Sequence, residues 1–298
     1  LFVVDVSKAF ENVKLEQILL AYKRVKLNKD YEFKTGDYWK EEVRIISSNS
    51  SIGLAKKLDL LPIYIDDDKL RVFARIMEDS VLLGKISETF RGLPFQRKIV
   101  PNGNIPILRG DNLGKYLIYG RIPKVSLSKT ELNNKKLNRL KQRKIISQRI
   151  VAHVMNPFDR IIVMATLDNE GYLTLDTVMN TFIIDSSFSY LYVLGILNSR
   201  LAEWFYYWFV YSRAIRTMHF DEYYMGRLPI KRVTFQNRAI VRRMEKLVSD
   251  ILKVKREKSH SDDANELEKQ VDGLVYKLYG LTDEEVRIIE EKINDKVL

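Results

Sequence analysis

The chain has 298 residues, enough for one large domain or two ordinary ones, and 46% of them are apolar and 11% aromatic. This composition can build a sizeable core, which excludes a disordered chain. Cysteine is absent and the three histidines lie far apart in the sequence. The sequence therefore excludes a disulfide scaffold and thiolate metal sites, shows no metal-binding spacing, and fits a reducing cytoplasm.

The first 80 residues form two segments of different pattern. Residues 1–34 alternate loosely between apolar and polar, which predicts two strands, or a strand and a helix. Residues 35–80 are mixed and include an acidic turn at residues 66–68, and residues 70–83 have the apolar spacing of a helix. The chain begins at Leu1 rather than Met and has no signal-peptide pattern, so we expect that an N-terminal part is missing.

The middle of the chain is rich in turn residues. Glycine and proline punctuate residues 92–123, which predicts a twisted, loop-rich β region of short strands. Residues 133–149 have the pattern of a basic helix. Residues 160–166 and 172–184 are predicted to form a hairpin joined by the turn at residues 168–171.

The C-terminal third has helical periodicity. Residues 189–211 predict one aromatic-rich helix, and Asn198, Arg200 and Glu203 at its centre favour a buried amphipathic helix over a membrane span. Residues 236–258 and 263–279 predict an antiparallel helix pair. Gly280 is expected to end the second helix, and a capping box of Thr282 and Glu285 to begin a last short one.

The positive charge is confined to one segment. Residues 84–150 contain sixteen Lys and Arg against three acids, a charge of +13, whereas the whole chain carries +11 and the other residues together about −2. Cations gathered in Gly- and Pro-rich loops are typical of a surface that binds a polyanion, and nucleic acid is the first candidate. A solvated basic surface is the alternative, and charge alone does not separate the two.

The search for catalytic motifs gives two weak matches. Residues 156–159 partly match the Asn/Asp-Pro-Pro-aromatic motif with which amino-methyltransferases hold a flipped base, but the second proline is missing, so an ordinary turn is favoured. Asp66, Asp67 and Asp68, followed by Lys69, could belong to a metal-dependent nuclease. No Glu-x-Lys on a neighbouring strand supports that site, and a solvated turn is again favoured.

The residue types in the basic segment suggest two kinds of DNA contact. Base readout in the major groove needs paired planar donors, whereas phosphates accept from cations and N–H groups. The candidate base contacts are Arg91, Gln96, Arg97, Arg109 and Asn112. The candidate phosphate contacts are Lys98, Lys115, Tyr116, Lys144, Arg149, Arg213 and Arg216. His219, near the last two, is expected to be a hydrogen-bonded structural residue.

Several stretches resemble one family in their order along the chain. They are Leu83-Gly84 with Arg91-Gly92, residues 106–113 with Lys115-Tyr116, and residues 144–146, 165–168, 194–201, 228–230 and 271–282. Together they resemble the C-terminal half of adenine-specific DNA methyltransferases of restriction–modification systems, and more narrowly the TaqI-like C-terminal specificity domain of type IIG enzymes. Residues 10–13 resemble the last strands of the methylase sheet.

The resemblance implies a function that composition and spacing do not show. A missing N-terminal part would bind S-adenosylmethionine, methylate N6 of a flipped adenine and in some relatives also cleave DNA. This chain would recognise the target sequence on double-stranded DNA, beside a methyltransferase domain of the same chain, in a prokaryotic cytoplasm and away from membranes. No cofactor, metal or catalytic residue is expected within the chain itself.

We therefore expect an α+β fold in four parts: the end of the methyltransferase sheet (residues 1–34), a connecting region (35–80), the target-recognition domain (81–235) and a helical tail (236–298). Three alternatives remain open. One is a nuclease that uses residues 66–68, and another is a nucleic-acid-binding scaffold without sequence preference. The third is a different relative, either a separate type I specificity subunit or a phage-exclusion methylase, although a type I subunit normally has two recognition modules.

Overall fold

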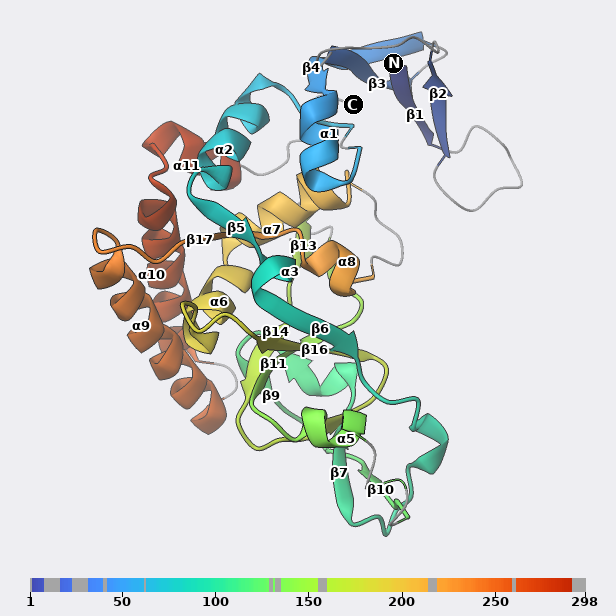
Figure 1. Ribbon diagram of the computed structural model, residues 1–298, viewed down its shortest axis with the longest axis vertical. Coiled ribbons are helices and arrows are strands. Elements are labelled where there is room, and N and C mark those ends of the chain that lie inside the picture. Colours follow the sequence, from blue (N-terminus) through green and yellow to red (C-terminus); the bar gives the residue numbers. More distant parts are fainter. Residues whose placement is uncertain are drawn as a thin grey trace.

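The computed structural model describes residues 2–7, 17–22, 32–39, 42–61, 63–128, 131, 135–154, 160–213, 219–258 and 261–290. In this part of the chain the molecule is elongated. A small sheet lies at the upper end, a mixed core in the middle, a helix pair along one flank and a loop-rich tip at the lower end (Figure 1). The expected α+β class is confirmed. No helix among the described residues is long and apolar enough to cross a membrane.

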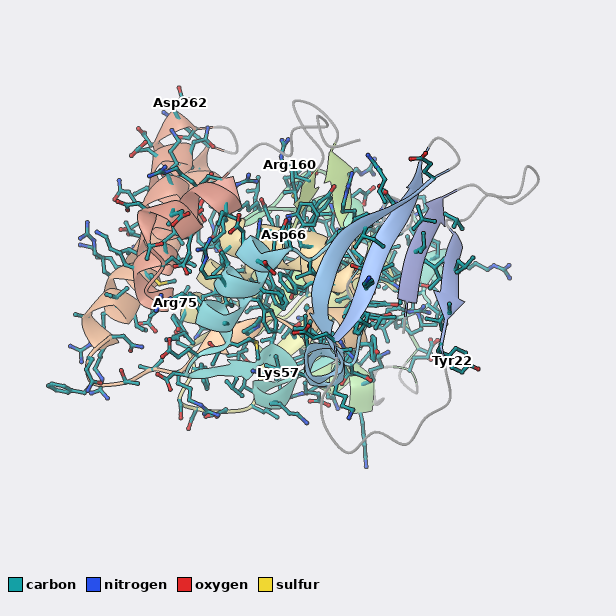
Figure 2. All side chains as sticks on the ribbon, turned by 90° about the horizontal axis from the view of Figure 1, so that it is seen from above. Tyr22, Lys57, Asp66, Arg75, Arg160 and Asp262 are labelled. Atoms are coloured by element: carbon teal, nitrogen blue, oxygen red, sulfur yellow. The ribbon has the colours of Figure 1, made fainter. Side chains whose placement is uncertain are left out.

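The sheet at the upper end has the order β2-β1-β3-β4. Its strands are β1 (Phe2–Ser7), β2 (Gln17–Ala21), β3 (Glu32–Trp39) and β4 (Glu42–Ser51). Strand β1 pairs parallel with β3, and the other pairs are antiparallel. Two strands in residues 1–34 are thus confirmed, whereas residues 10–13 lie outside the described residues. Seen from above, the sheet and Asp262 of the helix pair lie on opposite sides of the molecule (Figure 2).

The acidic turn is the beginning of a helix. Helix α1 (Ile52–Leu58) is followed by α2 (Asp67–Met77), and the Asp66 carboxylate caps α2 by accepting a hydrogen bond from the Lys69 N–H at 2.9 Å. Helix α2 ends before residue 83 because Asp79 has a left-handed φ of 48° and the chain enters strand β5. Among the described residues, no three His, Cys, Asp or Glu side chains lie together as a metal site.

The core contains a four-stranded antiparallel sheet of order β14-β11-β16-β6. Its strands are β6 (Ser87–Arg91), β11 (Lys144–Gln148), β14 (Ala165–Asp168) and β16 (Val178–Ile183). The predicted hairpin is wrong, because β11 lies between β14 and β16. In the sequence between β14 and β16 lies strand β15 (Leu173–Thr174), which leaves this sheet and pairs parallel with β7.

The predicted basic helix is only partly present. Helix α5 (Lys135–Leu140) is followed by β11, so the helical interpretation fails beyond residue 140. Ile145 packs in the main core and Ile146 in a separate cluster with Leu108, Leu113 and Val178. Adjacent apolar residues that are buried on opposite faces are typical of a central strand.

The aromatic segment is two helices rather than one. Helix α6 (Tyr190–Leu197) is followed by α7 (Arg200–Phe205) and one π-helical turn (Tyr206–Val210). The break occurs because Ser199 caps α7 by accepting from the Ala202 N–H at 3.2 Å. The Asn198 amide meanwhile donates to the Ala165 carbonyl at 2.9 Å. The expected burial is confirmed, and these aromatic side chains form the centre of the main core.

The helix pair at the C-terminus is confirmed. Helices α9 (Arg238–Glu257) and α10 (Asp262–Tyr279) pack on each other and, through α9, on α6. Gly195 of α6 allows this close approach, since a Cβ there would lie 3.0 Å from Val248. Gly280 ends α10 with a φ of 66°, and the capping box of Thr282 and Glu285 begins α11 (Asp283–Glu290).

Small elements complete the core around the main sheet. They are β5 (Ser80–Leu82), α3 (Leu83–Ile86), β12 (Ala152–Val154), β13 (Arg160–Ile162), α8 (Glu222–Met225) and β17 (Pro229–Lys231). Strand β17 pairs antiparallel with β5. This pairing brings the beginning and the end of the predicted recognition region next to each other.

The tip at the lower end has its own small core. It contains β7 (Ile105–Leu108), β10 (Lys124–Val125) and the 3-10 turn Gln96–Lys98. The 3-10 turn Gly110–Asn112 and strands β8 (Leu113–Gly114) and β9 (Leu117–Ile118) pack instead against β11 and β14 of the main sheet. Strands β10, β7 and β15 form a three-stranded sheet, and helix α5 packs against it through Leu137 and Leu140. The expected loop-rich β region is confirmed, and its loops extend from this apolar cluster.

Candidate nucleic-acid interface

A basic groove lies on the tip. It has a volume of about 710 Å³ and is lined by Ile99, Val100, Pro101, Arg109, Arg121, Ile122, Pro123 and Lys124. Its walls are held by backbone hydrogen bonds: the Val100 N–H donates to the Lys124 carbonyl, and the Ile107 N–H to the Pro123 carbonyl. Three cations and no acid line the groove, which therefore attracts an anionic ligand.

Arg109 enters the groove from a loop that Asn112 holds together. The Asn112 side chain accepts from the Arg109 N–H at 3.0 Å and donates to the carbonyls of Tyr119 and Arg121 at 3.1 and 3.3 Å. With only 4% of its surface exposed, Asn112 is a structural residue of the loop. Its predicted role as a base contact is contradicted, because its hydrogen-bonding groups are already used inside the protein.

The Arg109 side chain itself is accessible. It is 40% exposed and forms a forked pair with Asp111, with 2.9 Å between Nε and Oδ1. The hydrogen bond from Arg109 lowers the pKa of Asp111. An exposed pair of this kind is worth only about 0–1 kcal/mol. Arg109 can therefore exchange Asp111 for a ligand at little cost.

The other candidate base contacts lie on strand β6 and on the 3-10 turn that follows it. The Arg91 side chain is 47% exposed and lies 3.7 Å from Asp176, while Gln96 and Arg97 are both exposed on the turn. Lys98 on the same turn pairs with Glu131 and lowers the pKa of that carboxyl to about 2. Among the predicted base contacts, only Arg109 lines the groove itself.

Two predicted phosphate contacts are buried. The Lys144 side chain has no exposed surface, and its ammonium pairs with Asp168 and donates to the carbonyls of Leu140 and Tyr172. Burial lowers the pKa of Lys144, although Asp168 acts in the opposite sense. Tyr116 is 2% exposed. Both predictions are contradicted, since neither side chain can reach a phosphate while the core is intact.

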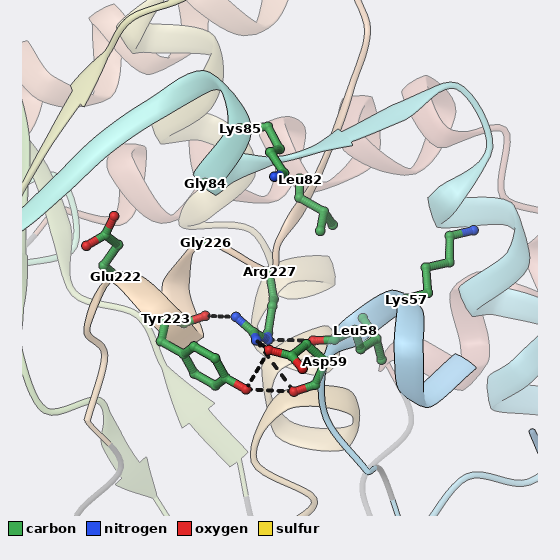
Figure 3. Close-up of a pocket in the computed structure, with 10 residues that line it drawn as sticks. All are labelled: Lys57, Leu58, Asp59, Leu82, Gly84, Lys85, Glu222, Tyr223, Gly226 and Arg227. Atoms are coloured by element: carbon green, nitrogen blue, oxygen red, sulfur yellow. Dashed lines mark hydrogen bonds and ion pairs between the residues drawn. The ribbon is translucent and has the colours of Figure 1, made fainter. Parts of the chain in front are cut away.

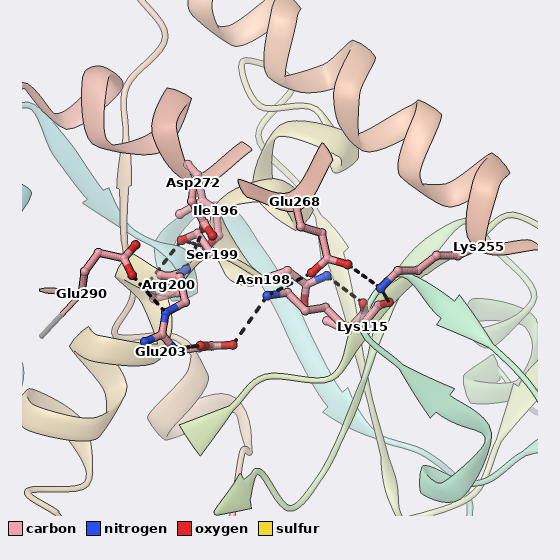
Figure 4. Close-up of polar contacts among 12 residues, drawn as sticks. Lys115, Ile196, Asn198, Ser199, Arg200, Glu203, Lys255, Glu268, Asp272 and Glu290 are labelled. Atoms are coloured by element: carbon pink, nitrogen blue, oxygen red, sulfur yellow. Dashed lines mark hydrogen bonds and ion pairs between the residues drawn. The ribbon is translucent and has the colours of Figure 1, made fainter. Parts of the chain in front are cut away.

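Lys115 points into the molecule toward acids of the helices. Its ammonium lies 3.7 Å from Glu203 and 3.4 Å from Glu268, which also pairs with Lys255 (Figure 4). Burial lowers the pKa of Lys115, but attraction by these carboxylates outweighs it and the pKa is raised. The structure thus contradicts Lys115 as a phosphate contact. It connects the β8–β9 turn to Glu203 of α7 and Glu268 of α10.

The remaining predicted contacts lie away from the groove. Arg149 hydrogen-bonds to Nδ1 of His219 at 2.8 Å, and because arginine can only donate, this histidine nitrogen accepts. The structural role expected for His219 is confirmed. The Arg213 guanidinium lies over the ring of Tyr64, 4.9 Å from its centroid. Arg216 lies outside the described residues, as do residues 156–159.

The sequence-based selection missed two cations of the groove. Arg121 and Lys124 are exposed and follow Gly120, whose φ of 73° turns the chain into the groove wall. Both belong to the basic segment, so the charge pattern contained the signal. What it did not contain is the pairing of β10 with β7, which brings these residues next to Arg109.

A second pocket, of about 460 Å³, lies between helices α1, α3 and α8 (Figure 3). The guanidinium of Arg227 lines this pocket. It donates to the Leu58 carbonyl and pairs with Asp59 at 3.0 Å, and it lies over the ring of Tyr223. Because these groups use one another's hydrogen-bonding capacity, we interpret the pocket as a polar contact between α1 and the core rather than as a ligand site.

The comparisons with known proteins concern mainly the middle of the chain. The sequence model of the TaqI-like C-terminal specificity domain matches residues 105–230. No curated protein matches the chain.

Similar solved structures include three proteins of restriction–modification systems. The HsdS subunit from Thermoanaerobacter tengcongensis is 15% identical, with 76% of this chain and 52% of that one covered and a TM-score of 0.34. The type I S subunit from M. genitalium is 12% identical (77% and 53% covered, TM-score 0.34). The type IIL enzyme MmeI in complex with DNA is 12% identical (97% and 44% covered, TM-score 0.45). The chain spans about half the length of these proteins.

Proposed function

We propose that residues 105–230, a TaqI-like C-terminal specificity domain, select a sequence on duplex DNA through the groove at the tip. One observation carries this proposal. All three cations of the groove, Arg109, Arg121 and Lys124, lie inside the segment that matches a specificity domain. A groove lined by cations, on loops that extend from an apolar cluster, is suited to a polyanion whose sequence must be read.

The structure supports a division of labour among these side chains. Arg109, with Arg91, Gln96 and Arg97, is proposed to read base edges, since a guanidinium can donate two parallel hydrogen bonds to guanine. Arg121 and Lys124 are proposed to bind phosphates on either side, together with Lys98, Arg149 and Arg213. Asn112, Lys115, Tyr116 and Lys144 are not part of the proposed interface, because they are engaged inside the protein.

We further propose that this recognition serves an N6-adenine methyltransferase of a restriction–modification system. The resemblance of segments in residues 83–282 to the C-terminal half of adenine-specific DNA methyltransferases supports this. The arrangement of methyltransferase and recognition domain on one chain, as in type IIG enzymes, and the use of S-adenosylmethionine belong to the same proposal. Incorporation of methyl groups from S-adenosylmethionine into duplexes that contain the selected motif, by the longer protein, would test it.

The test of recognition is a selection of bound duplexes from a random DNA pool at near-physiological salt, followed by sequencing. Enrichment of one short motif is expected. Arg109→Ala should then cost about 1–3 kcal/mol and relax the preference at one position of that motif. Lys124→Ala should weaken binding to all sequences alike and reduce the salt slope by about one.

Lys269→Ala on the exposed face of α10 is the matched control and should change neither quantity. Retention of DNA without enrichment would contradict sequence recognition and favour the non-specific scaffold. If Arg109→Ala and Lys124→Ala had the same effect on every sequence, the division of labour would be wrong.

A further inference from the structure

Helix α9 carries a second group of exposed cations outside the matched domain. Its buried face consists of Val241, Met244, Leu247, Val248 and Ile251. The residues that are exposed between positions 238 and 246 are Arg238, Ala239, Arg242, Arg243 and Lys246. We call the four cations the α9 cationic face. They lie opposite the apolar side, as the helical period requires.

The charges of the tail are segregated between its helices. Helix α9 has seven basic and three acidic residues, whereas α10 has two basic and five acidic ones. Glu245, the one acid near the α9 cationic face along the helix, is engaged with the Ser189 hydroxyl. Among the described residues, no carboxylate lies within 4.0 Å of Arg238, Arg242, Arg243 or Lys246.

This arrangement is unfavourable for the helix alone. Arg238 and Arg242 are four residues apart, as are Arg242 and Lys246, and like charges at that spacing repel each other on one helix face. A polyanion would relieve the repulsion. Between residues 238 and 246, Ala239 is the only uncharged exposed residue, and the one exposed aromatic nearby, Phe235, precedes the helix rather than lying among the four cations. Charge complementarity therefore favours phosphates over a protein surface.

We infer that the α9 cationic face binds the phosphate backbone of duplex DNA that flanks the recognised sequence. The inference rests on the proposed function, which places the recognised duplex at the tip. Lys255, near the C-terminal end of α9, donates to the Lys115 carbonyl in the matched domain at 3.0 Å. Arg238 lies 17 residues further along the helix, about 26 Å away.

The α9 helix lies along the flank of the molecule and the tip at its lower end (Figure 1). If the recognised motif lies at the tip, we expect only duplex that extends beyond the motif to contact the α9 cationic face. The affinity for DNA should therefore depend on the length of the flanking duplex, whereas binding by the tip alone would not depend on it.

The experiment compares the motif enriched by selection in two duplexes, one ending at the motif and one with about ten further base pairs on each side, which add about 34 Å per side. The 298-residue chain should bind the longer duplex more tightly. The variant Arg238→Gln, Arg242→Gln, Lys246→Gln should lose this gain while it keeps the same sequence preference. Its salt slope on the longer duplex should fall by about three, because each phosphate contact contributes about 0.9.

A matched variant, Lys269→Gln, Lys277→Gln, Arg287→Gln, removes three exposed cations from α10 and α11 and should keep the gain. Replacing Arg238 and Arg242 by lysine should keep it as well, since phosphates need the charge. Selective binding that is independent of duplex length, or a length gain that survives the Gln variant, would overturn the inference and leave the proposed function intact. If no sequence is enriched at all, the proposed function fails and this inference fails with it.

Discussion

A substitution of Lys144 tests whether this cation of the basic segment stabilises the fold or binds DNA. Its ammonium has three partners, the Asp168 carboxylate and the carbonyls of Leu140 and Tyr172, and the side chains of Lys144 and Asp168 are both fully buried. The variant Lys144→Met keeps the volume of the aliphatic stem but removes the charge. Breaking a buried pair on one side costs about 3–5 kcal/mol, because the remaining charge is left uncompensated.

The structure places the expected cost at the lower end of that range, about 3 kcal/mol. Asp168 retains three backbone donors, the N–H groups of Glu170, Gly171 and Tyr172, at 2.9 to 3.0 Å. Urea unfolding of the chain measures the cost as a lower midpoint at unchanged slope. Lys141→Met, an exposed neighbour three residues away, is the control and should change stability by less than about 0.5 kcal/mol.

The same variant also tests the interface. Because Lys144 does not reach the surface, the salt dependence of DNA binding by folded Lys144→Met should equal that of the wild type. A variant of unchanged stability whose salt slope falls by about one would refute this reasoning, because that pattern belongs to an exposed phosphate contact.

Three further predictions concern other parts of the molecule. Burial raises the pKa of Asp272 to about 7, so the stability that this carboxyl contributes is present below its ordinary pKa near 4 and is lost as the pH rises to about 7. Asp272→Asn, which keeps an acceptor for the Arg200 N–H, should be more stable than the wild type at pH 8 and lose that advantage near pH 4; equal pH profiles would contradict it. Asn112→Ala should cost about 1–3 kcal/mol in unfolding free energy, because it leaves the Tyr119 and Arg121 carbonyls without their donor, and a normal midpoint would exclude the role of Asn112 in the loop. Ser199→Ala should cost about 0.5–2 kcal/mol through the lost cap of α7, whereas Ser189→Ala, which also loses the Glu245 contact, should cost at least as much.

The elements that the sequence predicted correctly are those defined by local rules. Helices α9 and α10 are predicted by apolar residues that recur at the helical period. The helix ends are predicted by Gly280 and by the Thr282–Glu285 capping box, because only a few residue types suit these positions. The errors concern partners distant in the sequence. Nothing near residues 165–183 shows that β11 separates β14 from β16. The break between α6 and α7 had a local signal, since Ser199 is a good N-cap, but the apolar run around it obscured that signal.

The candidate site was predicted as a region rather than as a set of residues. The charge pattern identified the segment that builds the tip, and Arg109 was identified within it. The sequence favours Lys115 as a phosphate contact because it stands beside glycine in a basic loop, yet its partner Glu268 lies 153 residues further along the chain. Arg121 and Lys124 are not among the predicted contacts. Only the pairing of β7 with β10, which the sequence does not show, places them in the groove. Sequence alone gives the number of cations but not the side to which each one points.

The strength of each internal ion pair decides which cations are available to DNA. In the proposed interface, Arg109 would exchange Asp111 for guanine, because the exposed pair is worth about 0–1 kcal/mol and a bidentate base contact about 1–3 kcal/mol. Lys144 would have to leave Asp168 in the core, at a cost of about 3–5 kcal/mol that one phosphate contact does not recover. Arg121 and the α9 cationic face have no such pair to give up among the described residues. The proposed DNA binding therefore depends less on the net charge of +11 than on cations without a buried carboxylate partner, such as those of the groove and of the α9 cationic face.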